Sequence, residues 1–372
     1  MVFFVNSGFV KSFLKAANFV ELDITIISMA LLVLFSVFLI KNYSLKVEQL
    51  GMIVLFILFL AIYTSSFLYT SSENYYVKKL IALTGLFFSF LFGLLSTQAI
   101  ISNFYRYFSV FSVVAVSVYF GLTLSNLSAE VMKDFTGNSL VAGEMLGASI
   151  LIFYYGKSRF RYLLIILSFL IMVALGARGP MLFALLVLIL ASLRDVHRMS
   201  FKTPIYLAAV VPLIMIAVTI NKDSEFSLVA SKTFTDGLSR FELLFESDKG
   251  DSVNSRTVML SKTLEHIDEN ILWGTGVGSF GIEIYGKDDR AYPHNVPLEI
   301  WFESGVFAFI FFNLLLVLIL TRLIKAKNYL LVSLLIYLYL NMNKSSSLEE
   351  LRLFFLLAGI SVVSSHKKVE NY

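Results

Sequence analysis

The side chains that could carry chemistry gather in one polar passage, residues 254–305, in an otherwise apolar sequence. His294 lies near the end of this passage, shortly before Pro297 opens the next apolar segment. A histidine titrates near neutral pH and a neighbouring carboxylate can orient its ring, so His294 is a candidate general base. Glu299 and Glu303 follow on roughly one face of the expected helix. The alternative interpretation is a loop histidine without a catalytic task.

Two arginines are placed where an anion could bind. Arg178 lies between two apolar runs and precedes Gly-Pro, a pair that favours the opening of a helix. A helix N terminus offers free N–H groups and a positive dipole end. Arg256 heads an amphipathic run, where a cation is unfavourable unless an anion binds beside it. The simpler interpretations are a flanking arginine that snorkels and a solvated loop arginine.

Glu303 is expected about two turns inside an apolar segment. A carboxylate that faces lipid at that depth costs about 2 to 3 kcal/mol, so we expect Glu303 to face a polar cavity. Arg178 and Arg256 are its expected partners. The other two predicted substrate-binding residues flank the histidine: Tyr292 and Asn295.

The sequence lacks the motifs of several common kinds of site, namely metal sites, nucleotide-binding loops and serine-hydrolase sites. The sequence has no cysteine, no His-x-x-x-His and no Asp-x-Asp, so no metal site and no cofactor is predicted. The glycine-rich run 274–278 lacks the preceding strand and the following Lys-Ser/Thr of a nucleotide loop, and we interpret it as a turn that lets two helices meet. No Gly-x-Ser-x-Gly accompanies His294, so a serine hydrolase is not supported.

Composition indicates a multi-span membrane protein. The 372 residues are 58% hydrophobic and 15% charged, the mean hydropathy is +0.80, and apolar runs of about 20 residues recur. We therefore predict an all-α, polytopic transmembrane helical bundle of about 11 to 12 spans. The expected spans lie near residues 22–40, 51–70, 80–101, 107–124, 140–155, 161–177, 180–193, 203–220, 297–320, 328–341 and 349–363. Nucleic acid binding has no support, and no signal-peptide pattern precedes the first span.

Basic residues in short loops predict the orientation. Counting spans from four such loops places residues 177–180, 221–296 and 341–348 together on the extracytoplasmic face. The same parity puts Lys78 and Lys79 on that face as well, unless a span before residue 100 is miscounted. The predicted organisation is transmembrane helices in 1–220, an extracytoplasmic loop in 221–296 with amphipathic helices near Phe226–Leu244 and Arg256–Ile267, and transmembrane helices in 297–372.

Three motifs, in order, carry a resemblance to a known superfamily. They are Arg178-Gly179 after a span, Ser255-Arg256 before an amphipathic helix and the turn 272–280, and His294-Asn295 with Gly305. Residues 175–312 thereby resemble the superfamily of O-antigen ligases and Wzy-type O-antigen polymerases, bacterial membrane glycosyltransferases. Ala308 departs from the last position of the ligase pattern.

The resemblance implies a GT-C-like bundle in the bacterial inner membrane with its active site on the periplasmic face. The implied donor is a glycan on undecaprenyl diphosphate, whose diphosphate Arg178 and Arg256 would hold without a metal, while His294 takes the proton of the acceptor hydroxyl. The acceptor would be another lipid-linked glycan, as in a polymerase, or lipid A core, as in the ligase of lipopolysaccharide synthesis. Ala308 and the short chain favour the polymerase. Other polysaccharide assembly proteins are further implied partners.

Two functions of other classes stay open at this stage. A flippase or transporter would also have many spans, but repeat-related halves and ionisable residues near mid-membrane are expected there. Here the charges gather in one unequal loop. A membrane-bound O-acyltransferase could use a histidine and an asparagine, whereas extracytoplasmic arginines suit a diphosphate donor better than a thioester.

Overall fold

A computed structural model gives the fold of the protein and describes residues 1–7, 9–10, 24–40, 47–125, 129–194, 251–344 and 346–364. These residues form helices and connecting turns without a strand. Helices satisfy their backbone hydrogen bonds internally, which long apolar runs need in lipid. In chain order they are α1 (Val2–Val5), α3 (Ile24–Ile40), α4 (Val47–Ser65), η1 (Ser66–Leu68), α5 (Tyr75–Leu95), α6 (Gln98–Ser125), α7 (Ala129–Tyr155), α8 (Arg161–Ala174), α9 (Arg178–Arg194), α12 (Asp251–Glu269), α13 (Phe280–Tyr285), α14 (Val296–Lys325), α15 (Tyr329–Met342), η3 (Leu348–Glu350) and α16 (Arg352–Ser364).

The prediction of an all-α polytopic membrane protein is confirmed. Four stretches of the described chain are long and apolar enough to cross a membrane: Gln49–Leu68, Tyr75–Leu95, Gln98–Gly121 and Val296–Lys325. Shorter apolar helices occupy the predicted spans 22–40, 140–155, 161–177, 328–341 and 349–363, and α9 occupies 180–193. The predicted span 203–220 lies outside the described residues. The predicted amphipathic helix near Phe226–Leu244 lies outside them too, so the number of spans stays a prediction.

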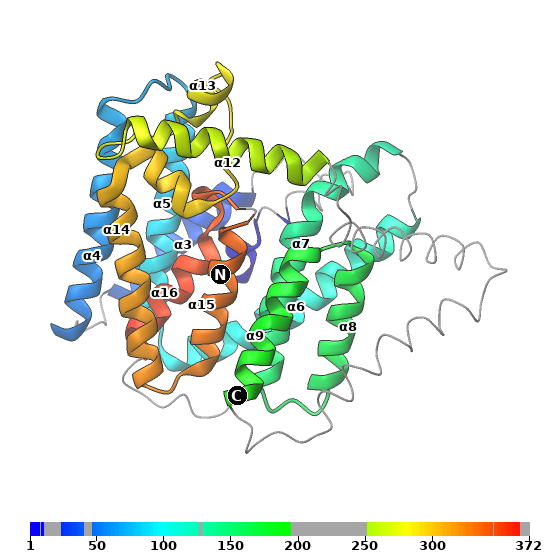
Figure 1. Cartoon of the computed structure of the whole chain (residues 1–372). Coiled ribbons are helices and arrows are strands. Elements are labelled where there is room, and N and C mark those ends of the chain that lie inside the picture. The colour runs from blue at the N-terminus through cyan, green and yellow to red at the C-terminus, as the bar shows by residue number, and fades with distance from the viewer. Residues whose placement is uncertain are drawn as a thin grey trace.

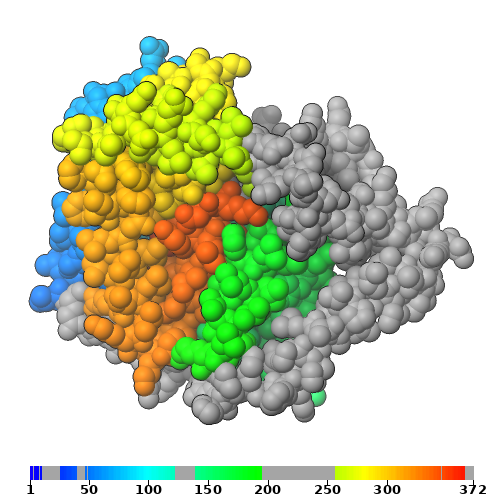
Figure 2. All heavy atoms as spheres, in the orientation of Figure 1, coloured from blue at the N-terminus to red at the C-terminus, as the bar shows by residue number. Residues whose placement is uncertain are grey.

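The helices form two groups joined by α15. In one group α5 packs on α3 and α16, and α14 packs on α4; in the other α7 packs on α6, α8 and α9 (Figure 1). The joining helix α15 contacts α7 and α9 on one side and α14 and α16 on the other. The amphipathic helix α12 lies across one end of α14, which it covers in the space-filling view (Figure 2). The predicted helix at Arg256–Ile267 is thereby confirmed.

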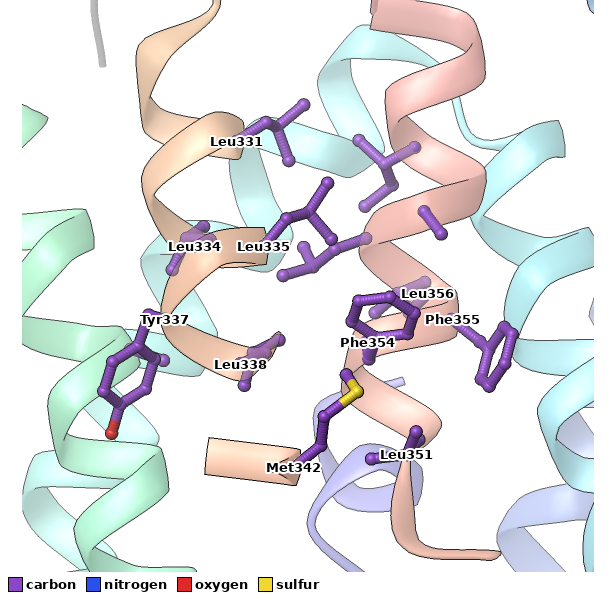
Figure 3. Packing of buried hydrophobic residues seen from close by; sticks show 14 of the residues in the cluster. Leu331, Leu334, Leu335, Tyr337, Leu338, Met342, Leu351, Phe354, Phe355 and Leu356 are labelled. Atoms are coloured by element: carbon purple, nitrogen blue, oxygen red, sulfur yellow. The ribbon is translucent and has the colours of Figure 1, made fainter. Parts of the chain in front are cut away.

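The core between α15 and α16 is built from large apolar side chains. Leu335, Leu338 and Met342 of α15 lie toward Phe354 and Leu351 of α16 (Figure 3). Apolar faces of this kind pack to crystal-like density, which fixes how the helices cross.

Tyr337 points the opposite way, toward α7 (Figure 3). Its hydroxyl lies 3.2 Å from the carbonyl oxygen of Gly143 and 3.3 Å from that of Glu144. A Cβ at Gly147 would lie 2.0 Å from this hydroxyl oxygen. Glycine in α7 therefore makes room for the tyrosine that joins the two groups.

Helix α14 is kinked at Gly305, and the glycine-rich turn completes its hydrogen bonds. Gly305 has φ 73° and ψ −178°, a conformation essentially reserved for glycine. Thr275 N and Gly276 N donate to the carbonyl oxygens of Phe302 and Glu303 at 2.8 Å each. A Cβ on Gly274 would lie 2.6 Å from the backbone of α14. The interpretation of 274–278 as a turn between helices is confirmed, with a second role as partner of the kink.

Helices α5 and α16 cross in close contact because two glycines face backbone. A Cβ on Gly93 would lie 2.2 Å from the carbonyl oxygen of Leu356, and one on Gly359 would lie 2.1 Å from that of Phe90. Small residues allow this approach of helices inside a membrane.

We expect Gly359→Ala to destabilise the protein by about 1 to 3 kcal/mol, because the added methyl group forces the two backbones apart. Gly51→Ala is the matched control, since a Cβ at Gly51 of α4 meets nothing within 4 Å. The measurement is the unfolding midpoint of the detergent-solubilised protein. Equal midpoints for the two variants would contradict this account of the crossing.

Candidate functional site

A buried ion-pair network lies where α4, α5 and α14 meet. Lys79 of α5 is fully buried, and its Nζ lies 2.5 Å from Glu299 Oε1 and 2.7 Å from Glu303 Oε1 on α14. The hydroxyl of Tyr63 on α4 donates to Glu303 Oε2. Buried charges persist only when paired and hydrogen-bonded, so these residues satisfy one another.

The network also holds the segment between α15 and α16. Glu299 accepts hydrogen bonds from Ser347 Oγ and from the backbone N–H of Leu348, both at 2.9 Å. Ser347 in turn forms a capping box with Glu350 at the start of η3. Glu299 therefore connects Lys79 to the turn that follows α15.

The expected partners of Glu303 were wrong. Glu303 faces away from lipid as predicted, but instead of lining a polar cavity it is fully buried and pairs with Lys79 and Tyr63, not with Arg178 or Arg256. The reason is topological: Lys79 of α5 reaches the carboxylates of α14 inside the bundle, which the order of spans in the sequence does not reveal. Glu303 is fully buried, so this carboxylate is better placed to hold other residues than to touch a substrate.

Three cations from three separate elements lie together at one end of the bundle. Arg178 is the first residue of α9, Arg256 lies near the start of α12, and Lys344 follows α15. A Cβ on Gly179 would lie 2.9 Å from Lys344 Nζ. Burial and then the positive charges of Arg256 and Arg178 lower the pKa of Lys344. An anion bound among the three would relieve this repulsion.

Lys344 was missed by the sequence analysis. Its signal was available, because segment 341–348 was expected on the extracytoplasmic face, where a lysine is disfavoured. The contact of Lys344 with Gly179 and the bond from Asn295 to Asn343 bring described parts of the three predicted segments together at one end of the bundle. The side of the membrane that this end faces stays a prediction.

His294 is attached to this end of the bundle through Asn295. The Asn295 side chain caps α14 by accepting from Leu298 N at 3.1 Å, and its Nδ2 donates to the carbonyl oxygen of Asn343 at 3.1 Å. Asn343 directly precedes Lys344. Asn295 thus has a structural role: its side chain holds the segment of His294 beside the segment of Lys344.

The imidazole of His294 is set by an unusual backbone and an aromatic neighbour. Its φ is 57°, in the left-handed region. Tyr292 packs edge-on against it with ring centroids 4.6 Å apart. Burial and the nearby Glu350 raise the pKa of Tyr292 to about 12, so its hydroxyl keeps its proton at neutral pH.

The arrangement suits the handling of an anionic group beside a histidine. Guanidinium and ammonium groups bind phosphate oxygens through charge-assisted hydrogen bonds. Among the residues that the structure describes, no group of three or more His, Asp or Glu is placed to hold a metal ion.

The fold and the site define a polytopic, all-α membrane protein with clustered cations at one end. Residues 163–313 match a family model described as O-antigen ligase, which confirms the resemblance to the superfamily of O-antigen ligases and Wzy-type polymerases. A search of curated proteins found no match. The matched region contains Arg178, Arg256 and His294 and excludes Lys79 and Lys344. The match to this family supports a ligase- or polymerase-type membrane function.

We expect Lys79→Met to destabilise the protein by about 3 to 5 kcal/mol, because two buried carboxylates lose their cation. Lys78→Met is the matched control, since Lys78 is the preceding residue of α5 and is exposed. Unfolding in detergent and the amount of protein in membranes are the measurements. If both variants unfold alike, the network does not hold these helices together.

Proposed function

We propose that the chain is a glycosyltransferase of the bacterial inner membrane that polymerises undecaprenyl-diphosphate-linked oligosaccharide repeat units on the periplasmic face. The observation that carries this proposal is the cluster of Arg178, Arg256 and Lys344 with the segment of His294 bonded beside it. Three cations with mutual repulsion suit a polyanionic group such as a diphosphate.

The proposed reaction is a direct displacement. The acceptor hydroxyl oxygen forms a bond to the anomeric carbon, the bond from that carbon to the diphosphate oxygen breaks, and the electron pair leaves with the lipid diphosphate. His294 takes the proton of the acceptor hydroxyl. The negative charge that develops on the leaving diphosphate is stabilised by the three cations, so no metal ion is part of the proposal.

Asn295, Tyr292 and Glu303 serve this site in different ways. Asn295 keeps the His294 segment next to residue 343. Tyr292 orients the imidazole through its edge contact. Glu303, fully buried beside Lys79, acts as a positioning residue for the first half of α14 rather than as a direct ligand.

A ligase that transfers the glycan to lipid A core is the second candidate. The description of the matching family favours it. The polymerase is favoured by Ala308, which departs from the ligase pattern and is fully buried in α14, so it leaves no hydroxyl at that position.

We expect His294→Asn to lower transfer about 10²- to 10⁴-fold, as loss of a general base does. Asparagine tolerates the left-handed backbone, so this change removes the imidazole with little strain. The measurement is elongation of lipid-linked glycan by purified protein. His266→Asn on α12 is the control and should keep normal activity. Normal transfer by the His294 variant would rule out the base assignment.

The surface polysaccharide of a deletion strain separates the two candidates. Loss of a polymerase is expected to leave single repeat units on the lipid core, because ligation still proceeds. Loss of a ligase leaves bare core. Gel analysis of extracted lipopolysaccharide reads out the difference, and complementation with the intact gene is the control. A bare core in the deletion strain would show that the protein acts as the ligase and not as the polymerase.

A further inference from the structure

A cavity that lies apart from His294 and the three cations opens between α1, α5, α7 and the start of α16. Its volume is about 600 Å³, within the range of small-molecule sites. The carboxylates in its lining are Glu144, Asp288, Asp289, Glu349 and Glu350. Phe9, Met145 and Leu351 contribute apolar surface to the same walls.

Most charged groups of the wall are already fixed by protein contacts. Arg290 forms ion pairs with Glu349 and, at 2.5 Å, with Glu350. Asp288 accepts from Ser72 Oγ at 2.6 Å and from Asn74 N at 2.6 Å, so it caps the start of α5. These contacts hold the cavity in one shape before any ligand binds, which lowers the entropy cost of binding.

Three charged groups of the wall lack such a contact among the described residues: Lys78 and Asp289, which are exposed, and Glu144. Glu144 lies on the apolar helix α7, is partly buried, and faces the cavity together with Val141. Among the described residues its carboxylate has no hydrogen-bond partner, whereas its backbone carbonyl accepts from Tyr337. A carboxylate on a membrane helix needs a polar partner, so a ligand with hydroxyl groups would complete this site.

The cavity and the cationic cluster lie on two sides of the same short segments. Gly143, the neighbour of Glu144, packs against Ala177, which directly precedes Arg178; a Cβ there would lie 2.6 Å from the Ala177 Cβ. Ser346 lines the cavity two residues after Lys344. A ligand in the cavity would therefore lie close to a group held by the three cations.

We infer that this cavity is the acceptor subsite, which binds an uncharged stretch of glycan through its hydroxyl groups. Carboxylates accept hydrogen bonds from sugar hydroxyls, and the apolar wall can contact the C–H faces of sugar rings. The surplus of carboxylates disfavours a diphosphate in the same place. The inference rests on the proposed transferase function and adds to it the class of ligand bound here.

The test measures binding of a glycan that cannot occupy the donor site. The probe is the repeat-unit oligosaccharide released from the host's own surface polysaccharide, free of lipid and diphosphate. Binding to the full-length protein in nanodiscs is followed by saturation-transfer NMR and calorimetry. We expect Glu144→Leu to weaken binding about tenfold or more, as loss of a hydrogen bond to a charged group does, and Glu144→Gln to weaken it less.

Further variants keep the test decisive. Val141→Trp fills the cavity from an exposed position without changing its charge, and it should also abolish binding. Glu265→Gln, exposed on α12, is the control and should bind as the unaltered protein does. Size-exclusion profiles report folding; if Glu144→Leu fails to fold, the Val141 variant decides.

The outcomes separate this inference from the proposed function. Lys344→Ala should lose transfer and still bind the free oligosaccharide. If Lys344→Ala and His294→Asn both kept full transfer, the proposed mechanism would fail while the binding site could stand. Failure of the unaltered protein to bind the oligosaccharide, or full binding by both cavity variants, overturns the acceptor subsite.

Discussion

The structure depends on one constraint: charges buried in an apolar bundle must meet their partners. Lys79 carries an ammonium with no access to solvent, and only the carboxylates of Glu299 and Glu303 neutralise it. Leaving any of these groups unpaired would cost several kcal/mol, so Lys79 of α5 must stay within reach of Glu299 and Glu303 of α14. The same network reaches Tyr63 on α4 and the turn after α15, and it thereby sets the positions of four elements at one end of the bundle.

The proposed site is built on that fixed end. The first half of α14 is held by the ion pairs on one side and by the turn 271–276 on the other, where backbone donors satisfy the carbonyls that the kink at Gly305 exposes. Asn295 caps the beginning of this half-helix and bonds to residue 343. The cations at the starts of α9 and α12 and after α15 repel one another and gain from a bound anion. Rigid elements thus hold the three cations that we propose bind the anionic group of the substrate.

Individual helices and site residues show how much of the structure could be predicted from the sequence. Apolar run lengths located both ends of α8, α9, α15 and α16 to within about three residues, because the hydrophobic thickness of a bilayer imposes the length of a span. The predicted span 140–155 gave the end of α7 but not its start, which lies at Ala129. The turn at 274–278 also follows from local residue types, whereas Asn295 was predicted to bind substrate and caps α14 in the structure. Arg178 and Arg256 were singled out for their positions, and they lie together. Lys344 was overlooked since a single lysine after a span resembles any flanking residue, and Glu303 was assigned the wrong cations.

By itself, then, the sequence determined the helical membrane class, the candidate cations and the histidine before Pro297, because hydropathy, capping and charge placement act over a few residues. The tertiary structure decided which distant charges meet. Lys79 and Glu299 are separated by 220 positions, and no local pattern records that this lysine of α5 meets the carboxylates of α14. The carboxylate-lined cavity has the same origin, since its walls come from α1, α5, α7 and α16 and exist only once these helices have packed.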